Sequence, residues 1–286
     1  MSAVFPAGVR VTTVTLSGLF ILALVFCFPG CGNKDKGKPV WQGTSGTRNG
    51  PPVDNGSDLI NFENYFWPHD TDWRWTFHAV DLSVGVDEYA CYTEIAPSMM
   101  FGNAGNQVEV FPLQGSPIPW YGTPAHYRFI WYLAESESGE LVQHRFAIYP
   151  QYYWELDTPF VWGKRGMALG ETITTTATAR QHDFTTGQYL YSDETWSFSV
   201  TLEGREEVTV PLSFFPNCIK VTFTIVRSGT PWYIETCWFS WGDGFVKSHV
   251  TKLPDPWQDF VPPLPNPVNP ITVDIRREAI DIWYPE

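Results

Sequence analysis

Alternation of apolar and polar residues is the feature that most limits how this chain can fold. In Trp196–Leu202, apolar residues alternate with Ser and Thr, and Ile219–Ile225 repeats the pattern with Lys and Thr between the apolar positions. Similar runs begin at Trp73 and Tyr127. Successive side chains of a strand point to opposite faces, so this period of two is typical of strands with one buried and one wet face. A helical period hardly appears, and the sequence predicts an all-β protein.

Short polar segments separate these runs and predict tight connections between neighbouring strands. The candidate turns are Ser136–Glu140, Thr185–Gly187, Glu203–Arg205 and Ser228–Pro231, each short enough for a hairpin. The Thr-rich segment Thr172–Thr178 suits an exposed strand. We therefore expect an antiparallel meander of long hairpins that forms a curved sheet or a partly open barrel.

The N-terminus has the pattern of an export signal. An apolar run, Val11–Phe28, follows a single basic residue, Arg10, and leads into Gly30-Cys31 and a polar stretch. An apolar segment that ends in a small residue and a cysteine is typical of a bacterial lipoprotein signal peptide, so we expect residues 1–30 to be removed and Cys31 to carry a lipid. An uncleaved membrane anchor is the alternative, because the run is about as long as the roughly 18 residues that a span needs.

Either interpretation places the body of the protein outside the cytoplasm, in the bacterial cell envelope, with its membrane contact at the N-terminus. Gly32, and not Asp, follows Cys31, which favours the periplasmic side of the outer membrane in a cell with two membranes. Residues 31–57 are rich in Gly, Asn, Lys, Pro, Ser and Thr, and we expect a flexible tether there. The β domain is expected over 58–253, followed by a Pro-rich C-terminal tail over 254–286.

Charge and aromatic content bound the range of partners. The chain carries 18 Lys and Arg against 31 Asp and Glu, a formal net charge of −13. Such an acidic surface repels phosphate backbones, so we expect no nucleic-acid partner. Aromatic residues make up 16% of the chain, with 14 Trp. Most of these suit the core of a sheet protein, and a stacking surface for sugars or apolar ligands is the alternative.

Five cysteines are present, and the signal-peptide interpretation divides them. Cys27 is removed and Cys31 is lipidated, which leaves Cys91, Cys218 and Cys237 in an oxidising compartment. Cys218 and Cys237 flank a predicted hairpin and are a candidate disulfide, provided that the turn brings them opposite each other; three buried free thiols are the alternative. No His or basic residue adjoins them to lower a thiol pKa, so no catalytic thiol is expected. No cysteine spacing indicates zinc.

Three segments carry a recognisable pattern. Val208–Val221 contains a strand that ends in Val-Pro, then Phe, Cys and Lys-Val; Trp238–Lys247 contains an aromatic strand, a Gly-x-Gly turn and Val-Lys. Tyr65–Phe77 contains a Phe-Trp-Pro and an aromatic-x-aromatic pair. Together they resemble the TapB-like family of uncharacterised bacterial envelope lipoproteins over about Leu59–Lys252. The resemblance implies an all-β envelope lipoprotein domain without an established reaction, and no catalytic residue comes with it.

The residues of this pattern have an architectural interpretation. They are Pro211, Phe215, Cys218, Trp238, Gly242 and Gly244. We expect Pro211 to end a strand, Phe215 to fill the core, and Gly242 and Gly244 to adopt positive φ at a turn. The chain departs from the family at Leu212-Ser213, where Ala-Gly is usual, and this puts the local turn geometry in question more than the fold.

Two acidic clusters are candidates for a metal site and a sugar site, and both have simpler structural explanations. His69–Asp72 gathers an imidazole and carboxylates in one loop. A hard divalent cation needs about six oxygen ligands, no others can be named, and a solvated loop is the preferred interpretation. Glu155 and Asp157 lie on one face of a strand beside aromatic residues, as in a sugar site, but acids that protect an edge strand look the same. We expect no metal and no cofactor.

The sequence contains no motif for nucleophilic catalysis or phosphate binding. We therefore favour a lipid-anchored, non-enzymatic envelope protein whose β domain binds an unknown protein or an apolar ligand. A carbohydrate-binding or glycan-cleaving envelope protein is the alternative, motivated by the abundance of Trp and acidic residues. A closed apolar cavity would support the first hypothesis, and a line of exposed coplanar Trp rings would support the second.

Overall fold

A computed structural model of the chain describes residues 59–66, 73–83, 87–102, 107–115, 128–190, 193–254 and 270–283. The expected signal peptide and tether, with Cys31, lie outside these residues, as do His69–Asp72 and the Pro-rich segment 255–269. The described residues are mostly strands, with one short 3-10 helix, η1 (Phe62–Asn64). No helix in this part of the chain is long and apolar enough to span a membrane.

The strands of the described residues follow one another along the chain with short connections. They are β1 (Leu59–Ile60), β2 (Arg74–Asp81), β3 (Asp87–Ile95), β4 (Met99–Phe101), β5 (Val108–Gly115), β6 (Arg128–Glu135), β7 (Leu141–Tyr149), β8 (Tyr152–Gly163), β9 (Met167–Ala168), β10 (Thr172–Asp183), β11 (Glu194–Thr209), β12 (Phe214–Arg227), β13 (Thr230–Ser240), β14 (Gly244–Pro254) and β15 (Pro270–Trp283).

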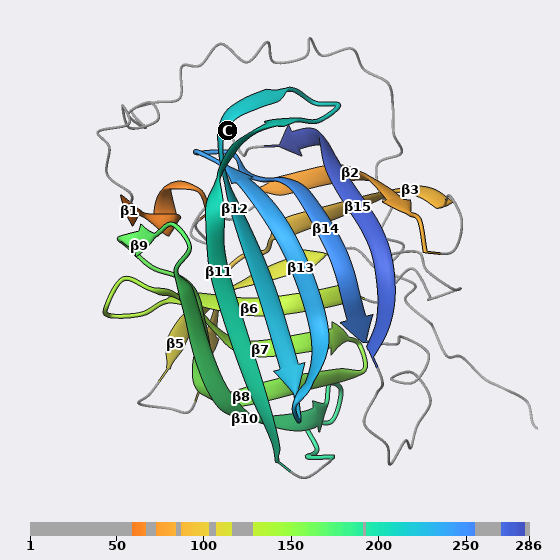
Figure 1. Cartoon of the computed structure of the whole chain (residues 1–286). Coiled ribbons are helices and arrows are strands. Elements are labelled where there is room, and N and C mark those ends of the chain that lie inside the picture. Colours follow the sequence, from red (N-terminus) through yellow and green to blue (C-terminus); the bar gives the residue numbers. More distant parts are fainter. Residues whose placement is uncertain are drawn as a thin grey trace, which may run out of the picture. The chain divides into compact units, whose positions relative to one another are not determined.

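One antiparallel sheet closes on itself to form a barrel (Figure 1). From β5 to β15 the strands lie side by side in chain order, apart from β9. The N-terminal hairpin of β2 and β3 then pairs with β15, and β3 pairs with β5. Strand β4 extends the sheet outside this ring, and β1 pairs with β9 in a separate small sheet. The predicted all-β antiparallel meander is confirmed, and its ring is closed.

The interior of the barrel is filled by aromatic side chains. Figure 1 shows β12–β14 crossing in front of β6–β8, and side chains from these two layers meet. Trp162 of β8 packs against Phe223 of β12 with ring centroids 4.9 Å apart, and Phe146 of β7 contacts Trp232 of β13 at 6.0 Å. The apolar residues of the alternating run Ile219–Ile225 are buried, as the sequence predicts.

The residues before β2 insert two aromatic rings into this core. Phe62 and Phe66 are 1% and 3% exposed, and the Phe62 N–H donates a hydrogen bond to the Lys164 carbonyl oxygen at 3.2 Å. Gly163 makes room for this packing, because a Cβ there would lie 2.4 Å from Phe62 Cγ. We refer to residues 59–66 as the N-terminal plug.

One predicted turn is wrong. Glu203–Arg205 lies inside β11, where Leu202 pairs with Val221 and Gly204 with Lys220, so Glu203 is the extra residue of a bulge. A glycine between polar residues fits a bulge as well as a turn, and the sequence does not separate the two. The chain reverses after β11 instead, where the Val210 N–H donates to the Ser213 carbonyl oxygen at 3.0 Å.

The β domain extends beyond its expected end at residue 253. Part of the segment assigned to a Pro-rich tail forms β15, which lies inside the barrel wall between β14 and β2. Proline disfavours strand interiors because it lacks an N–H donor. In β15 the only proline is Pro270, the first residue, so the prolines that suggested a tail precede the strand and do not interrupt it.

Candidate functional site

The barrel closes between β3 and β5 at a short junction, which we call the seam. Three residue pairs join these strands, and the middle pair is Glu94 opposite Gln114. Eight pairs join β2 to β3 on the other side. The outer wall of the barrel is hollowed at this junction by a pocket, which we call the seam pocket.

Four residues from four strands form a line across the seam. Trp283 of β15 lies opposite Arg74 of β2, Arg74 lies opposite Glu94 of β3, and Glu94 lies opposite Gln114 of β5. Their outward direction follows from their neighbours along each strand, which are buried or packed against the core. We call these four residues the seam row.

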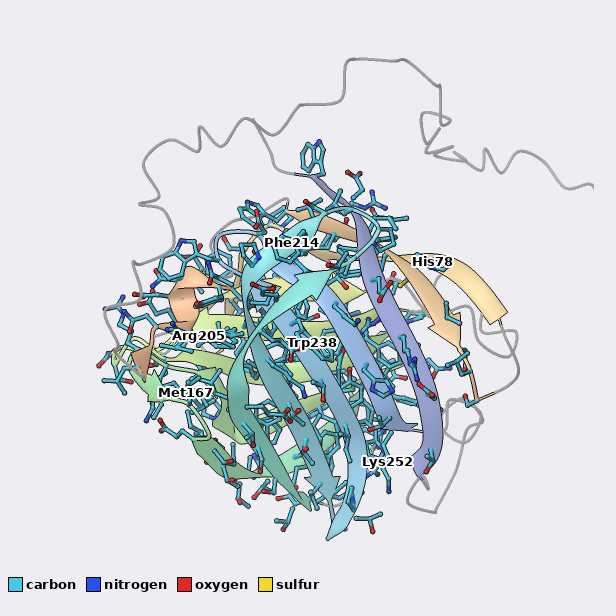
Figure 2. All side chains as sticks on the ribbon, turned by 45° about the horizontal axis from the view of Figure 1, so that its top comes forward. His78, Met167, Arg205, Phe214, Trp238 and Lys252 are labelled. Carbon is cyan, nitrogen blue, oxygen red and sulfur yellow. The ribbon has the colours of Figure 1, made fainter. Side chains whose placement is uncertain are left out.

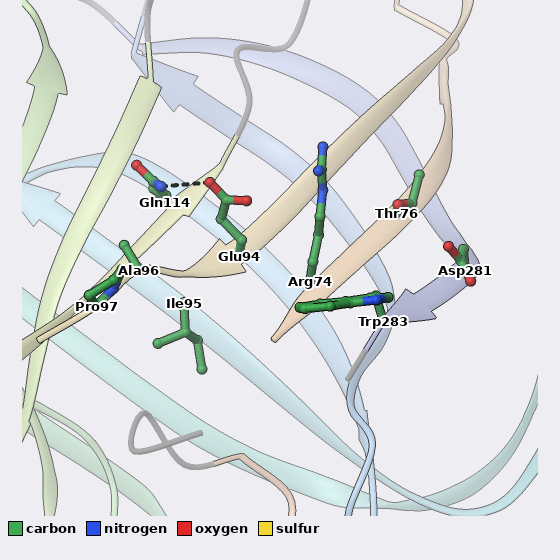
Figure 3. Close-up of a pocket in the computed structure, with 9 residues that line it drawn as sticks. All are labelled: Arg74, Thr76, Glu94, Ile95, Ala96, Pro97, Gln114, Asp281 and Trp283. Carbon is green, nitrogen blue, oxygen red and sulfur yellow. Dashed lines mark hydrogen bonds between the residues drawn. The ribbon is translucent and has the colours of Figure 1, made fainter. Parts of the chain in front are cut away.

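The seam row lines an open pocket on the outer wall (Figure 3). Its volume is about 520 Å³, within the range of roughly 300–1,000 Å³ that small-molecule sites occupy. The other lining residues come from the same strands and from the segment after β3; they are Thr76, Ile95, Ala96, Pro97 and Asp281.

Charged groups of both signs face the pocket. Gln114 Nε2 donates a hydrogen bond to Glu94 Oε1 at 2.6 Å, which orients the carboxylate (Figure 3). The Arg74 guanidinium lies over the ring of Tyr92, 4.0 Å from its centroid, and makes no ion pair with any residue that the structure describes. A guanidinium stacked on a ring keeps its five in-plane N–H donors directed outward.

Trp283 supplies an aromatic face to the same pocket. Its side chain is 52% exposed, although its backbone pairs with Arg74 and the preceding residue, Ile282, packs against the core. The other tryptophans that the structure describes are buried or half-buried. The indole therefore stands on an ordered strand and offers a surface on which a flat or ring-shaped ligand can stack.

A second polar cluster lies inside the barrel. Arg277 of β15 donates hydrogen bonds to Glu235 of β13 and, from Nε, to Ser248 Oγ of β14 at 2.7 Å. Tyr233 donates to the other oxygen of Glu235. Burial alone would lower the pKa of Arg277, but the charge of Glu235 raises it; burial, reinforced by Glu235, raises the pKa of Tyr233. These groups satisfy one another, so the cluster serves the fold.

The interior leaves little room for a ligand. The cavity between this polar cluster and the surrounding rings has a volume of about 30 Å³, which is about the volume that one molecule occupies in liquid water. This cavity is therefore too small to hold an apolar ligand. The described residues present a single exposed Trp, and not a line of coplanar rings. Neither this cavity nor the exposed Trp separates the two sequence-based hypotheses.

The candidate disulfide between Cys218 and Cys237 is not formed, and both thiols are free. The register of β12 and β13 places Cys218 opposite Ser240 and Cys237 opposite Val221. The two cysteines therefore sit at different levels of the hairpin. A disulfide needs Cα atoms about 4.4–6.8 Å apart with Cβ atoms facing each other.

Burial makes all three described thiols poor nucleophiles. It raises the pKa of Cys218 to about 12, with the charges of Asp243 and Glu206 adding to the effect. Burial likewise raises the pKa of Cys91 and of Cys237. The thiolate is the reactive form, so these cysteines behave as small core residues.

Most residues of the family-like pattern occupy structural positions. Pro211 follows the end of β11, and Phe215 is 9% exposed within the core. Gly242 and Gly244 have φ of 76° and 73° in the turn between β13 and β14. A Cβ at Gly244 would also lie 2.6 Å from Trp75 Cζ2. Glycine is required here by both the backbone conformation and the close approach of an indole.

Trp238 of the same pattern lies on the outer face of β13 (Figure 2). The ammonium groups of Lys220 and Lys247 lie 5.7 and 5.6 Å from its ring centroid, and its Nε1 donates a hydrogen bond to Glu206. The ring is covered by these charged side chains, so it offers no open stacking surface.

The acids that looked most like a sugar site have structural partners. Glu155 accepts a hydrogen bond from Arg145 Nη2 at 2.5 Å, and Asp157 accepts one from the Thr178 N–H at 2.8 Å. His69–Asp72 lies outside the described residues. Among the residues that are described, no group of His, Cys, Asp and Glu is arranged to hold a metal ion.

The seam row cannot be predicted from the sequence pattern. Alternation along β2 does place Arg74 on the polar face, but it does not tell which strands become neighbours. Glu94 and Gln114 meet only because the ring closes there. Trp283 lay in the segment interpreted as a tail. The one available signal was Trp283 itself, an aromatic residue at the end of a run that could form a strand.

No family model and no curated protein matches this chain. It is similar to a solved structure from Bacteroides fragilis, described as an exported protein with a YmcC-like fold, at 10% identity and a TM-score of 0.39, over 77% of this chain and 99% of that chain. A protein from Parabacteroides distasonis, described as a lipoprotein, is similar at 10% identity and a TM-score of 0.36 over the same shares. Similarity this distant supports no conclusion about function.

Proposed function

We propose that this chain is a lipid-anchored protein of the bacterial envelope that binds a polar ligand in the seam pocket. The observation that carries the proposal is the seam row, in which Trp283, Arg74, Glu94 and Gln114 line one open pocket of about 520 Å³. The apolar run that ends at Gly30-Cys31 supports export and anchoring. The resemblance to TapB-like lipoproteins supports the same compartment.

The outer wall is favoured over the interior as the binding surface. The lumen is filled by aromatic rings and its remaining cavity holds about 30 Å³. The seam pocket instead combines a guanidinium, two carboxylates, an amide and an indole. Buried charged groups are costly when unpaired, so an apolar ligand would lose free energy by covering Arg74 and Glu94. This replaces the apolar ligand of the first hypothesis with a polar one.

The proposed role is binding and not catalysis. The described thiols are buried and have raised pKa values. The groups around the seam pocket are those of recognition: hydrogen-bond donors, acceptors and one stacking surface.

Native mass spectrometry of the full chain, purified from membranes in mild detergent, tests the proposal. We expect the wild type to retain a bound non-protein mass that Trp283→Ala does not retain. Tyr189→Ala is a matched control, because Tyr189 is 47% exposed and does not line the pocket. A wild type without bound mass, or equal retention by Trp283→Ala, would contradict binding at the seam.

A further inference from the structure

We infer that the ligand of the seam pocket is a neutral oligosaccharide. One sugar ring packs its C–H face on Trp283, and its hydroxyl groups bind Arg74 and Glu94. This inference rests on the proposed function, because it names the ligand class of the same pocket.

Trp283 is suited to stack on a sugar ring. A pyranose presents C–H groups on its faces and hydroxyl groups at its rim, so it packs on an aromatic ring while its rim stays in contact with polar groups. The indole is 52% exposed, yet its strand is fixed by pairing to β2 and by Ile282 in the core. A ring that is already ordered loses little conformational freedom on binding.

The polar members of the seam row match the two roles of a hydroxyl group, which both donates and accepts hydrogen bonds. The Arg74 guanidinium supplies donors, and the Glu94 carboxylate supplies acceptor positions beyond the one that Gln114 occupies. Residues directly opposite each other on paired antiparallel strands have Cβ atoms about 4.5–5.5 Å apart. Arg74 and Glu94 are such a pair, so one donor group and one acceptor group can reach neighbouring hydroxyls of a single ring.

Charge favours a neutral sugar over an acidic one. The pocket contains one guanidinium and two carboxylates, Glu94 and Asp281, and the chain as a whole has a formal net charge of −13. A uronic or phosphorylated sugar would meet this excess of negative charge. A ligand without charge avoids that repulsion and still satisfies the polar groups.

A glycan array that carries neutral and acidic oligosaccharides tests the inference with the detergent-solubilised full chain. We expect binding to neutral glycans, and the same free oligosaccharide should compete for this binding. Titration calorimetry with that oligosaccharide measures the affinity. Trp283→Ala should weaken that affinity by about tenfold or more, since stacking on a ring is worth about a factor of ten. Trp283→Phe should retain most of the affinity, Glu94→Gln should weaken it several-fold, and Tyr189→Ala should leave it unchanged. Thermal unfolding midpoints of the variants check that each one folds.

The outcomes separate this inference from the proposed function. Binding restricted to acidic glycans, no binding to any glycan, or full binding by Trp283→Ala would overturn the inference. If mass spectrometry then shows a bound mass that is not a sugar and that Trp283→Ala loses, the seam pocket binds a different polar ligand. If it shows no bound mass either, both the inference and the proposed function are wrong.

Discussion

Arg277 of β15 reaches past β14 to donate a hydrogen bond to Glu235 of β13, inside a barrel whose other interior residues are mostly apolar. Their side chains are 17% and 9% exposed. Removing one partner of a buried ion pair leaves an uncompensated charge and costs about 3–5 kcal/mol. Replacing both partners by apolar residues of similar volume is often close to neutral, because the desolvation penalty disappears as well.

We therefore expect Glu235→Leu to lower the free energy of unfolding by about 3–5 kcal/mol. The double variant Glu235→Leu/Arg277→Met should be more stable than Glu235→Leu alone. Chemical denaturation of the three proteins measures the effect. A double variant less stable than Glu235→Leu would mean that the two residues are not energetically coupled as a pair.

Glu235 and Arg277 also show which features of the fold the sequence pattern predicts and which it does not. Alternation predicted the strands and the buried faces of β11 and β12, because apolar side chains there keep a strict period of two. It could not predict Glu235 inside the barrel, since a charged residue normally marks a wet face. It could not predict the seam row either, because β2, β3, β5 and β15 come together through ring closure between distant parts of the chain.

The N-terminal plug gives a second prediction, from the contact between Gly163 and Phe62. A Cβ at position 163 would lie 2.4 Å from Phe62 Cγ, and overpacking of this kind costs about 1–3 kcal/mol. Gly163→Ala should lose that stability in thermal or chemical unfolding. Gly204→Ala is the matched control, because no heavy atom lies within 4 Å of its added Cβ.

The double variant Gly163→Ala/Phe62→Ala tests the cause. Phe62→Ala alone should cost about 3–5 kcal/mol as a large core truncation. The double variant should cost less than the sum of the two single variants, because the clash is gone once the ring is removed. Additive costs would show that Gly163 acts through its backbone and not through room for Phe62.

Anchoring gives a third prediction, on residues outside the described structure. Cys31→Ala should abolish incorporation of radiolabelled palmitate and remove the mature protein from the membrane fraction, because Cys31 is the expected acylation site. Cys27→Ala, a change inside the expected signal peptide, is the control and should still be lipidated. A Cys31→Ala protein that is fully processed and membrane-bound would contradict the lipoprotein interpretation.

Acid stability gives a fourth prediction, from Glu194 and Arg227. Arg227 Nη2 donates to Glu194 Oε1 at 2.9 Å, with Arg227 Nε bonded to the other carboxylate oxygen. Burial alone would raise the pKa of Glu194, but the hydrogen bonds and charge of Arg227 bring it below its ordinary value of 4.5. A carboxyl with a lowered folded-state pKa stabilises the protein fully above its unfolded-state pKa, and this stabilisation is lost as pH falls through the folded-state pKa.

The difference in unfolding free energy between wild type and Glu194→Gln should therefore be constant near neutral pH and shrink as the pH falls below about 4.5. Denaturation curves between about pH 7 and pH 3 measure this difference. Glu137→Gln, on the exposed turn between β6 and β7, is the control and should change the free energy of unfolding little near neutral pH. A difference for Glu194→Gln that does not change with pH would mean that the ion pair is not linked to protonation.

The thiols give the fifth prediction. Cys91, Cys218 and Cys237 are buried and free, and burial raises the pKa of each one. Because the thiolate is the reactive form, an aromatic disulfide reagent at mildly alkaline pH should not label the native protein. Unfolding in guanidinium should expose three reactive thiols in the mature chain.

Ser138→Cys, on an exposed turn, should add one thiol that reacts at once in the native state and serves as the positive control. Rapid native labelling of the wild type, or a Cys218–Cys237 linked peptide in a non-reduced digest, would show that the packing around β12 and β13 differs from the described structure.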